Sequence, residues 1–218
     1  MKMIAIGDIH GCARTLDGLL RQLIPEPDDH LIFIGDYMDR GPDSKGVIDR
    51  LLALAEEQRC TFLRGNHEDL FLGYLDRGEY DIFAINGGIA TLSSYMDSDG
   101  DMEIPQSHVD FVRKTELYLE TDEFVFVHAG LRPDRSVAEN LSENNQEVFL
   151  WERSHLKVNS LPWEKTVICG HTPVPQVVNE PNLINIDTGC VYHTHPSMGF
   201  LTAVVLPERR FVSVPYMG

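Results

Sequence analysis

The sequence is poor in cysteine, in basic residues and in long apolar runs. Its four cysteines are scattered without a C-x-x-C pair, which favours reduced thiols over a disulfide framework. No apolar run approaches membrane-spanning length and no secretory signal is visible, so we expect a cytoplasmic protein with no membrane partner. Only 18 basic residues face 34 acidic ones, giving a net charge of −16. Because nucleic acid is bound first through clustered Lys and Arg, nucleic acid is not an expected partner either.

The length of 218 residues fits one α/β domain over residues 1–218, and neither a repeat nor a linker marks a boundary. Short apolar runs, most of them stopped by glycine or a polar triplet, predict buried strands; they lie at 3–6, 30–34, 60–63, 124–127 and 166–169. Leucines at helical spacing lie between the first and second of these runs and again between the second and third. This alternation predicts a βαβαβα order with parallel strands. Residues 177–215 are rich in further strand patterns. We therefore predict two facing sheets with helices outside, and a helical insertion or cap at about 78–122.

Polar triplets follow five of the predicted strands. They contain Asp8 with His10, Asp36 with Asp39 and Arg40, Arg64 with Asn66 and His67, His128, and His171. In a parallel sheet the loops that leave the carboxyl ends of the strands gather at one edge, where ligands bind. A single Asp or His at the end of a strand is usually structural or solvated, but five such triplets in chain order are unlikely to arise independently. The sequence therefore predicts one site that is built from all five loops.

The residue types of this site favour a pair of divalent metal ions. Carboxylate, amide and imidazole ligands together suit Mn, Fe or Zn better than Mg or Ca. Asp36 can bridge two ions through its two carboxylate oxygens. Two ions about 3.5–4 Å apart clamp the attacking and leaving oxygens of an in-line displacement and lower the pKa of a bridging water. We therefore expect attack by a metal-bridging hydroxide on a phosphate ester.

The remaining polar residues of the loops have expected roles in catalysis. His67 adjoins Asn66 and is predicted to protonate the leaving oxygen, with Asp39 fixing the tautomer of its ring. Arg40 can bind the non-bridging oxygens of a phosphate through its planar fork of donors, and Arg64 and Arg153 are further candidates for this clamp. Arg64 is equally well explained as a structural arginine that pairs with a carboxylate. Trp151 is expected in the core rather than at the substrate.

The motifs GDIHG, GDYMDRG, RGNHE, HAG and GHT, in this order, resemble the phosphoprotein phosphatase family of metallophosphatases, in particular its bacterial and phage branch. The resemblance runs from Ile4 to about Tyr192. It implies an αββα sandwich and a site that is usually assayed with manganese. By position, it implies one metal held by Asp8, His10 and Asp36, and a second held by Asp36, Asn66, His128 and His171. It also supports His67 with Asp39 as the acid and its partner, and Arg40 and Arg153 as phosphate ligands.

Two departures from the eukaryotic members limit the resemblance. Residues 187–192 stand where those enzymes carry a Ser-Ala-Pro-Asn-Tyr loop, so sensitivity to their natural toxins is not expected. Regulatory subunits that bind long C-terminal segments are not implied, and the oligomeric state is left open.

The expected activity is that of a serine/threonine protein phosphatase, extending to phosphotyrosine, with a phosphoprotein or phosphopeptide as partner. The alternative is a symmetrical dinucleoside tetraphosphate hydrolase, a relative that shares most of the motifs. Asp39 and Glu68 follow the protein phosphatase form, whereas the hydrolases typically have Ala and Asp at these positions. An alkoxide leaving group also needs a well-oriented acid more than a nucleotide does. A non-catalytic metal-binding scaffold would have lost a ligand or the acid, and neither loss is visible.

Overall fold

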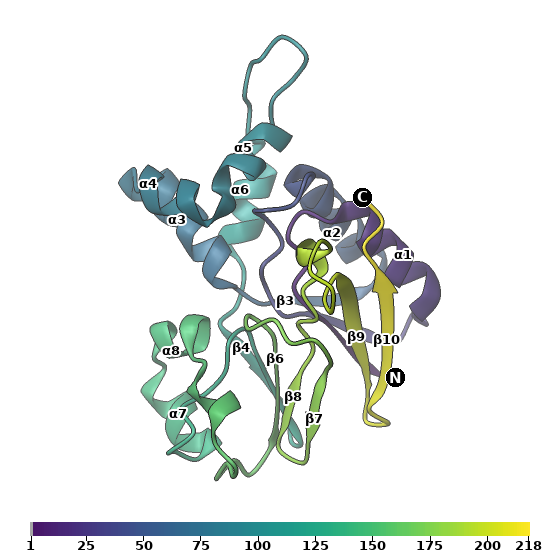
Figure 1. The fold of residues 1–218 in the computed structure, drawn as a ribbon, viewed down its shortest axis with the longest axis vertical. Helices are drawn as coiled ribbons and strands as arrows, with labels where there is room; N and C mark the ends of the chain where they lie inside the picture. The colour runs from purple at the N-terminus through teal and green to yellow at the C-terminus, as the bar shows by residue number, and fades with distance from the viewer. Residues whose placement is uncertain (1) are drawn as a thin grey trace.

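A computed structural model describes residues 2–218 as two five-stranded sheets packed face to face, with helices on both outer sides (Figure 1). The predicted αββα sandwich of two mixed sheets is confirmed. Among the described residues, no helix has both the length and the apolarity needed to cross a membrane.

The first sheet has the strand order β10-β9-β1-β2-β3. Its strands are β1 (Met3–Ile6), β2 (His30–Phe33), β3 (Arg59–Phe62), β9 (Phe200–Leu206) and β10 (Arg210–Pro215). The pairs β1–β2 and β2–β3 are parallel, as the βαβαβ pattern predicts, while β9 returns antiparallel to β1. The crossovers between the parallel strands are α1 (Ala13–Leu23) and α2 (Ser44–Glu57).

The second sheet has the order β4-β5-β6-β8-β7. Its strands are β4 (Tyr118–Glu120), β5 (Phe124–Val127), β6 (Thr166–Cys169), β7 (Val178–Glu180) and β8 (Leu183–Asn185). The central pairs β5–β6 and β6–β8 are parallel, and both edge strands are antiparallel to their neighbours. The helices α7 (Val137–Glu143) and α8 (Gln146–Trp151) and the 3-10 turn η2 (Ser154–Lys157) follow β5.

The alternation of side chains along each strand separates the core into layers. In β1, Ile4 and Ile6 pack beneath the helices of the first sheet, whereas Ala5 packs between the sheets. In β5, Phe124 and Phe126 face the first sheet, and Val125 and Val127 contact α7 and α8. The sheets approach closely at their carboxyl edges, where a Cβ on Gly7 would lie 2.7 Å from the carbonyl oxygen of Ile186. This approach brings the loops of both sheets to one place.

The segment at 78–122, predicted as an insertion or cap, follows α3 (Asn66–Arg77). It contains α4 (Tyr80–Phe83), the π-helical turn η1 (Ala84–Gly88), α5 (Ile89–Ser94) and α6 (Gln106–Arg113). Its last part is not cap but sheet, because β4 lies within it and pairs with β5. Phe111 and Val112 of α6 join the core beneath the helices of the first sheet, so the segment packs onto the domain.

Candidate metal centre

The five polar loops meet at the shared carboxyl edge of the two sheets. There are two groups of three residues, and within each group the potential ligand atoms all lie within 4.8 Å of one another: His10, Asp36 and His67 form the first, and Asp36, His128 and His171 form the second. Asn66 joins the second group, because its Oδ1 lies 2.8 Å from Nδ1 of His171. All of these side chains are buried. The sequence placed each residue after a strand, and the fold brings the loops together.

Asp36 lies between the two groups. Its Oδ2 is 3.4 Å from Nε2 of His10, and its Oδ1 is 3.4 Å from Nε2 of His128. The two oxygens of one carboxylate therefore face two different histidines. This is the arrangement that a bridging ligand requires.

The ring nitrogens of two histidines are oriented by backbone carbonyls. Nδ1 of His128 donates to the carbonyl of Ile34 at 2.9 Å, so its Nε2 carries a lone pair. This Nε2 lies 3.0 Å from Oδ1 of Asn66, which is also an acceptor. Nδ1 of His10 likewise donates to the carbonyl of Met38 at 2.9 Å, which leaves its Nε2 as an acceptor. The acceptors of His128 and Asn66, which converge without a proton between them, fit a bound cation, and carbonyl contacts of this kind orient metal-binding histidines.

The carboxylates near the site are close together and partly unsatisfied. Oδ2 of Asp8 accepts the backbone N–H of His171 at 3.0 Å, while its Oδ1 is buried without a partner among the described residues. Burial and the charge of Asp187 raise the pKa of Asp8 well above its usual value. Burial and the charge of Asp36 raise the pKa of Asp187 to about 7. Since buried carboxylates need compensating charge, this donor set fits divalent metal ions.

The backbone around the site adopts unusual conformations. Positive φ angles occur at His10 (47°), Asp36 (54°), Asp39 (70°), Arg40 (67°) and His171 (63°). Residues other than glycine rarely adopt this region, and such conformations cluster at functional sites. Surrounding contacts hold them in place: Glu68 accepts the N–H groups of Asp36 (2.8 Å), Tyr37 (2.9 Å) and Gly65 (2.8 Å).

A buried acid–base pair lies beside the metal groups. Nδ1 of His67 is 2.7 Å from Oδ2 of Asp39, and both side chains are buried. Nε2 of His67 is buried without a partner among the described residues and lies 4.0 Å from Oδ2 of Asp36. Burial opposes ionisation of His67, but the charge of Asp36 and the hydrogen bond to Asp39 outweigh it and raise the pKa of His67.

The three predicted arginines lie in different places. Arg40 donates to Nε2 of His10 at 2.7 Å and lies over the ring of Tyr192, 5.7 Å from its centroid. Arg153 donates to Oγ1 of Thr172 at 3.2 Å, directly after His171. Arg64 instead donates to Oγ1 of Thr115 at 3.1 Å and to the carbonyl of Arg113 at 3.1 Å. These contacts argue against Arg64 as a phosphate ligand and make it an anchor for the segment 78–122.

Two further residues near the site were not predicted there. Oγ1 of Thr91, in α5, donates to Oδ1 of Asp39 at 2.6 Å and accepts its N–H at 2.9 Å. Trp151 was expected in the core, but the residue is 40% exposed. Its ring meets that of His171 edge to face, with the centroids 5.7 Å apart. No local pattern marks Thr91, whereas Trp151 could have been suspected from its place two residues before Arg153.

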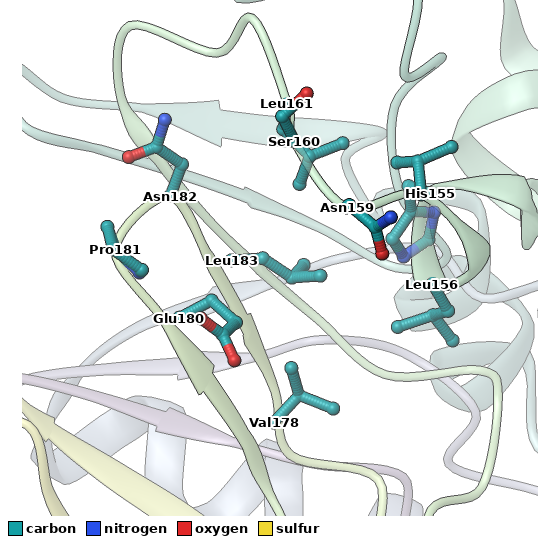
Figure 2. Close-up of a pocket in the computed structure, with 11 residues that line it drawn as sticks. His155, Leu156, Asn159, Ser160, Leu161, Val178, Glu180, Pro181, Asn182 and Leu183 are labelled. Carbon is teal, nitrogen blue, oxygen red and sulfur yellow. The ribbon is translucent and has the colours of Figure 1, made fainter.

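A hollow of about 490 Å³ lies on the outer side of the second sheet, between η2 and the β7–β8 hairpin. Figure 2 shows Asn159 and Asn182 around it, with His155 at one end. The described residues that line it include none of the predicted metal or phosphate ligands. It therefore has no evident part in the metal centre.

Comparisons with known proteins agree with this site. The model of the calcineurin-like phosphoesterase family matches residues 1–198. The asymmetrical bis(5′-nucleosyl)-tetraphosphatase PrpE of Geobacillus thermodenitrificans is 30% identical over an alignment of 237 positions, which covers 99% of this chain and 94% of that protein. A symmetrical bis(5′-nucleosyl)-tetraphosphatase of Janthinobacterium is 25% identical, over 98% of this chain and 96% of that protein.

A solved structure of a candidate diadenosine tetraphosphatase superposes with a TM-score of 0.72 at 26% identity. The match covers 100% of this chain and 94% of that one. The family uses two divalent metal ions, and the described residues bring two groups of potential metal ligands together at this centre. The chain therefore belongs to the calcineurin-like phosphoesterase family.

Proposed function

We propose that this chain is a metal-dependent hydrolase of bis(5′-nucleosyl) tetraphosphates. One observation carries the proposal. Two relatives named for this activity match nearly the whole chain, at 30% and 25% sequence identity. The match includes the loops of the metal centre.

The expectation of a serine/threonine protein phosphatase with a phosphoprotein partner is wrong, since these relatives are tetraphosphatases. It rested on Asp39 and Glu68 as markers of the substrate. The carboxylate of Glu68 accepts three backbone N–H groups of the ligand loops, and Asp39 holds His67. Both residues are buried. They support the reacting centre rather than contact the organic part of a substrate. The likeness to the bacterial and phage branch stays a prediction.

We propose that Asp8, His10 and Asp36 hold one metal ion and that Asp36, Asn66, His128 and His171 hold the other. When bound, the ions would supply an activated water and neutralise charge on the phosphates. The mixed oxygen and nitrogen donors suit manganese, iron or zinc. We propose manganese on the strength of the family resemblance, with iron or zinc as alternatives. Elemental analysis of protein purified without added metal tests this choice.

The protein's own residues would orient the phosphate chain and move a proton. Arg40 and Arg153 flank the centre, and their guanidinium groups can each bind two phosphate oxygens. Nε2 of His67 would give its proton to the oxygen that departs with the leaving nucleotide. Asp39 would fix the ring so that Nδ1 keeps its own proton. A phosphate leaving group needs this proton less than an alkoxide does, so the acid is expected to contribute at the lower end of its range.

The relatives differ in which bond they break. Symmetrical cleavage yields two nucleoside diphosphates, whereas asymmetrical cleavage yields a triphosphate and a monophosphate. We propose asymmetrical cleavage, because the relative at 30% identity carries that name and the symmetrical one is at 25%.

The test is to load the protein with manganese and compare kcat/KM for diadenosine tetraphosphate and a phosphoserine peptide, with His67→Asn as control. A higher kcat/KM for the dinucleotide that falls in the variant is expected. A preference for the peptide would overturn the proposal.

A further inference from the structure

Trp151 presents an aromatic face at the rim of the metal centre. It is the last residue of α8 and is 40% exposed, although burial of an indole is strongly favourable. One side of it is fixed against His171, with the ring centroids 5.7 Å apart and the planes at 87°. The metal centre and this platform are therefore in direct contact.

A hollow of about 450 Å³ lies next to Trp151, a size within the usual range of small-molecule sites. It is lined by Trp151 and Leu150, and by Asp69, Gln146 and Glu147. Asp69 lies in α3 three residues after Asn66, so the two side chains share one side of that helix. Nε2 of Gln146 donates to Oδ1 of Asp69 at 2.8 Å and joins α8 to α3. The hollow thus opens between these helices beside the metal centre.

Charge separates the two sides of Trp151. Arg153, bonded to Thr172, lies on the side of the metal centre and suits phosphate. Asp69 and Glu147 line the hollow, where their carboxylates would repel a phosphate chain but accept hydrogen bonds from the amino group of a base. A ligand with an anionic end and a neutral, flat, amino-bearing end matches this arrangement.

We infer that Trp151 is the stacking surface of a nucleobase subsite, with Asp69 and Gln146 facing the edge of the base. The identity of the ligand rests on the proposed tetraphosphatase function. The purine of the nucleotide whose phosphates occupy the metal centre stacks on the free face of the indole. Stacking of one base on an aromatic side chain typically changes affinity about tenfold on alanine substitution.

Tryptophan fluorescence tests the subsite without measuring turnover. The sequence has two tryptophans, and the other, Trp163, is only 2% exposed. In manganese-loaded protein, AMP should quench the emission more strongly than inorganic phosphate, because only AMP carries a base. Trp151→Phe should remove this difference. Equal quenching by AMP and phosphate, or a difference that persists in the variant, would overturn the subsite.

Kinetics separate the subsite from the proposed function. Trp151→Ala should raise KM for diadenosine tetraphosphate about tenfold more than it raises KM for inorganic tripolyphosphate, which has no base. Trp151→Phe should retain most of the affinity, and Tyr80→Ala, an exposed aromatic on α4, is the matched control. If Trp151→Ala hydrolyses the dinucleotide with an unchanged KM, the proposed subsite is refuted and the proposed function stands. If AMP quenches the emission selectively but the protein cannot cleave the dinucleotide, the subsite stands and the proposed function is refuted.

Discussion

Replacing Thr91 with valine tests how α5 supports the acid–base pair. Valine has nearly the shape of threonine but lacks the hydroxyl. Oγ1 of Thr91 donates to Oδ1 of Asp39 at 2.6 Å, accepts the N–H of Asp39 at 2.9 Å, and lies 2.9 Å from Oγ of Ser44. The N–H of Asp39 keeps a second acceptor, because it also donates to Oγ of Ser44 at 3.1 Å. The main loss is therefore the hydrogen bond to the buried carboxylate.

A hydrogen bond to a charged group contributes about 1.5–3 kcal/mol, and a buried acceptor left without its donor costs a similar amount. We expect Thr91→Val to lower the free energy of unfolding by about 2–3 kcal/mol. Thr91→Ser keeps the hydroxyl and loses one methyl group, so it should lower this free energy by only about 1 kcal/mol. Turnover should fall in the valine variant as well, because Asp39 then orients His67 less firmly.

Urea denaturation at fixed metal concentration measures both variants, provided that the m-values agree. Turnover of diadenosine tetraphosphate is measured on the same preparations. Equal destabilisation by valine and serine would show that packing, not the hydrogen bond to Asp39, is what Thr91 contributes. A valine variant within about 0.5 kcal/mol of the parent would refute the reasoning, since that is the usual size of surface effects.

Three further substitutions test the site. His67→Asn should lower turnover about 10²-fold, the lower end of the range for a lost general acid, and keep the metal content, and loss of metal would instead make His67 a ligand. Asp36→Asn should reduce the occupancy of both metals in elemental analysis, whereas loss of only one contradicts the bridge. Gly87→Ala should lower the free energy of unfolding by about 1–3 kcal/mol in urea titrations, because φ is 105° and the new Cβ would lie 2.7 Å from Cγ of Arg40. An unchanged midpoint would show that this contact yields easily.

Sequence patterns predicted the strands of the sandwich well where glycine or a polar triplet closes an apolar run. Residues 3–6, 124–127 and 166–169 are strands with the expected bounds. The same glycines and polar triplets predicted that the ligand loops lie at the carboxyl edge, because chain order and strand direction together determine where the loops lie. Periodicity was weaker in the segment at 78–122, where β4 joins the second sheet although no strand was expected there.

Contacts between distant segments could not be predicted. Thr91 meets Asp39 across 52 positions of the chain, and nothing near either residue indicates the pair. Trp151 was expected in the core rather than at the substrate, but a residue at the end of a helix can face either side. Glu68 was read as a marker of the substrate, although its hydrogen bonds are to backbone N–H groups of the ligand loops. The substrate class depends on the surface around the centre, which the buried motifs do not specify.

The most direct test of the account is hydrolysis of diadenosine tetraphosphate by the manganese-loaded protein in ¹⁸O-labelled water, with identification of the products by mass spectrometry. The account predicts ATP and AMP, with the label in one of them, and a much lower rate in Asp36→Asn. Formation of two ADP molecules would keep the tetraphosphatase and refute asymmetrical cleavage. Absence of nucleotide products, or an undiminished rate in Asp36→Asn, would contradict the central claim.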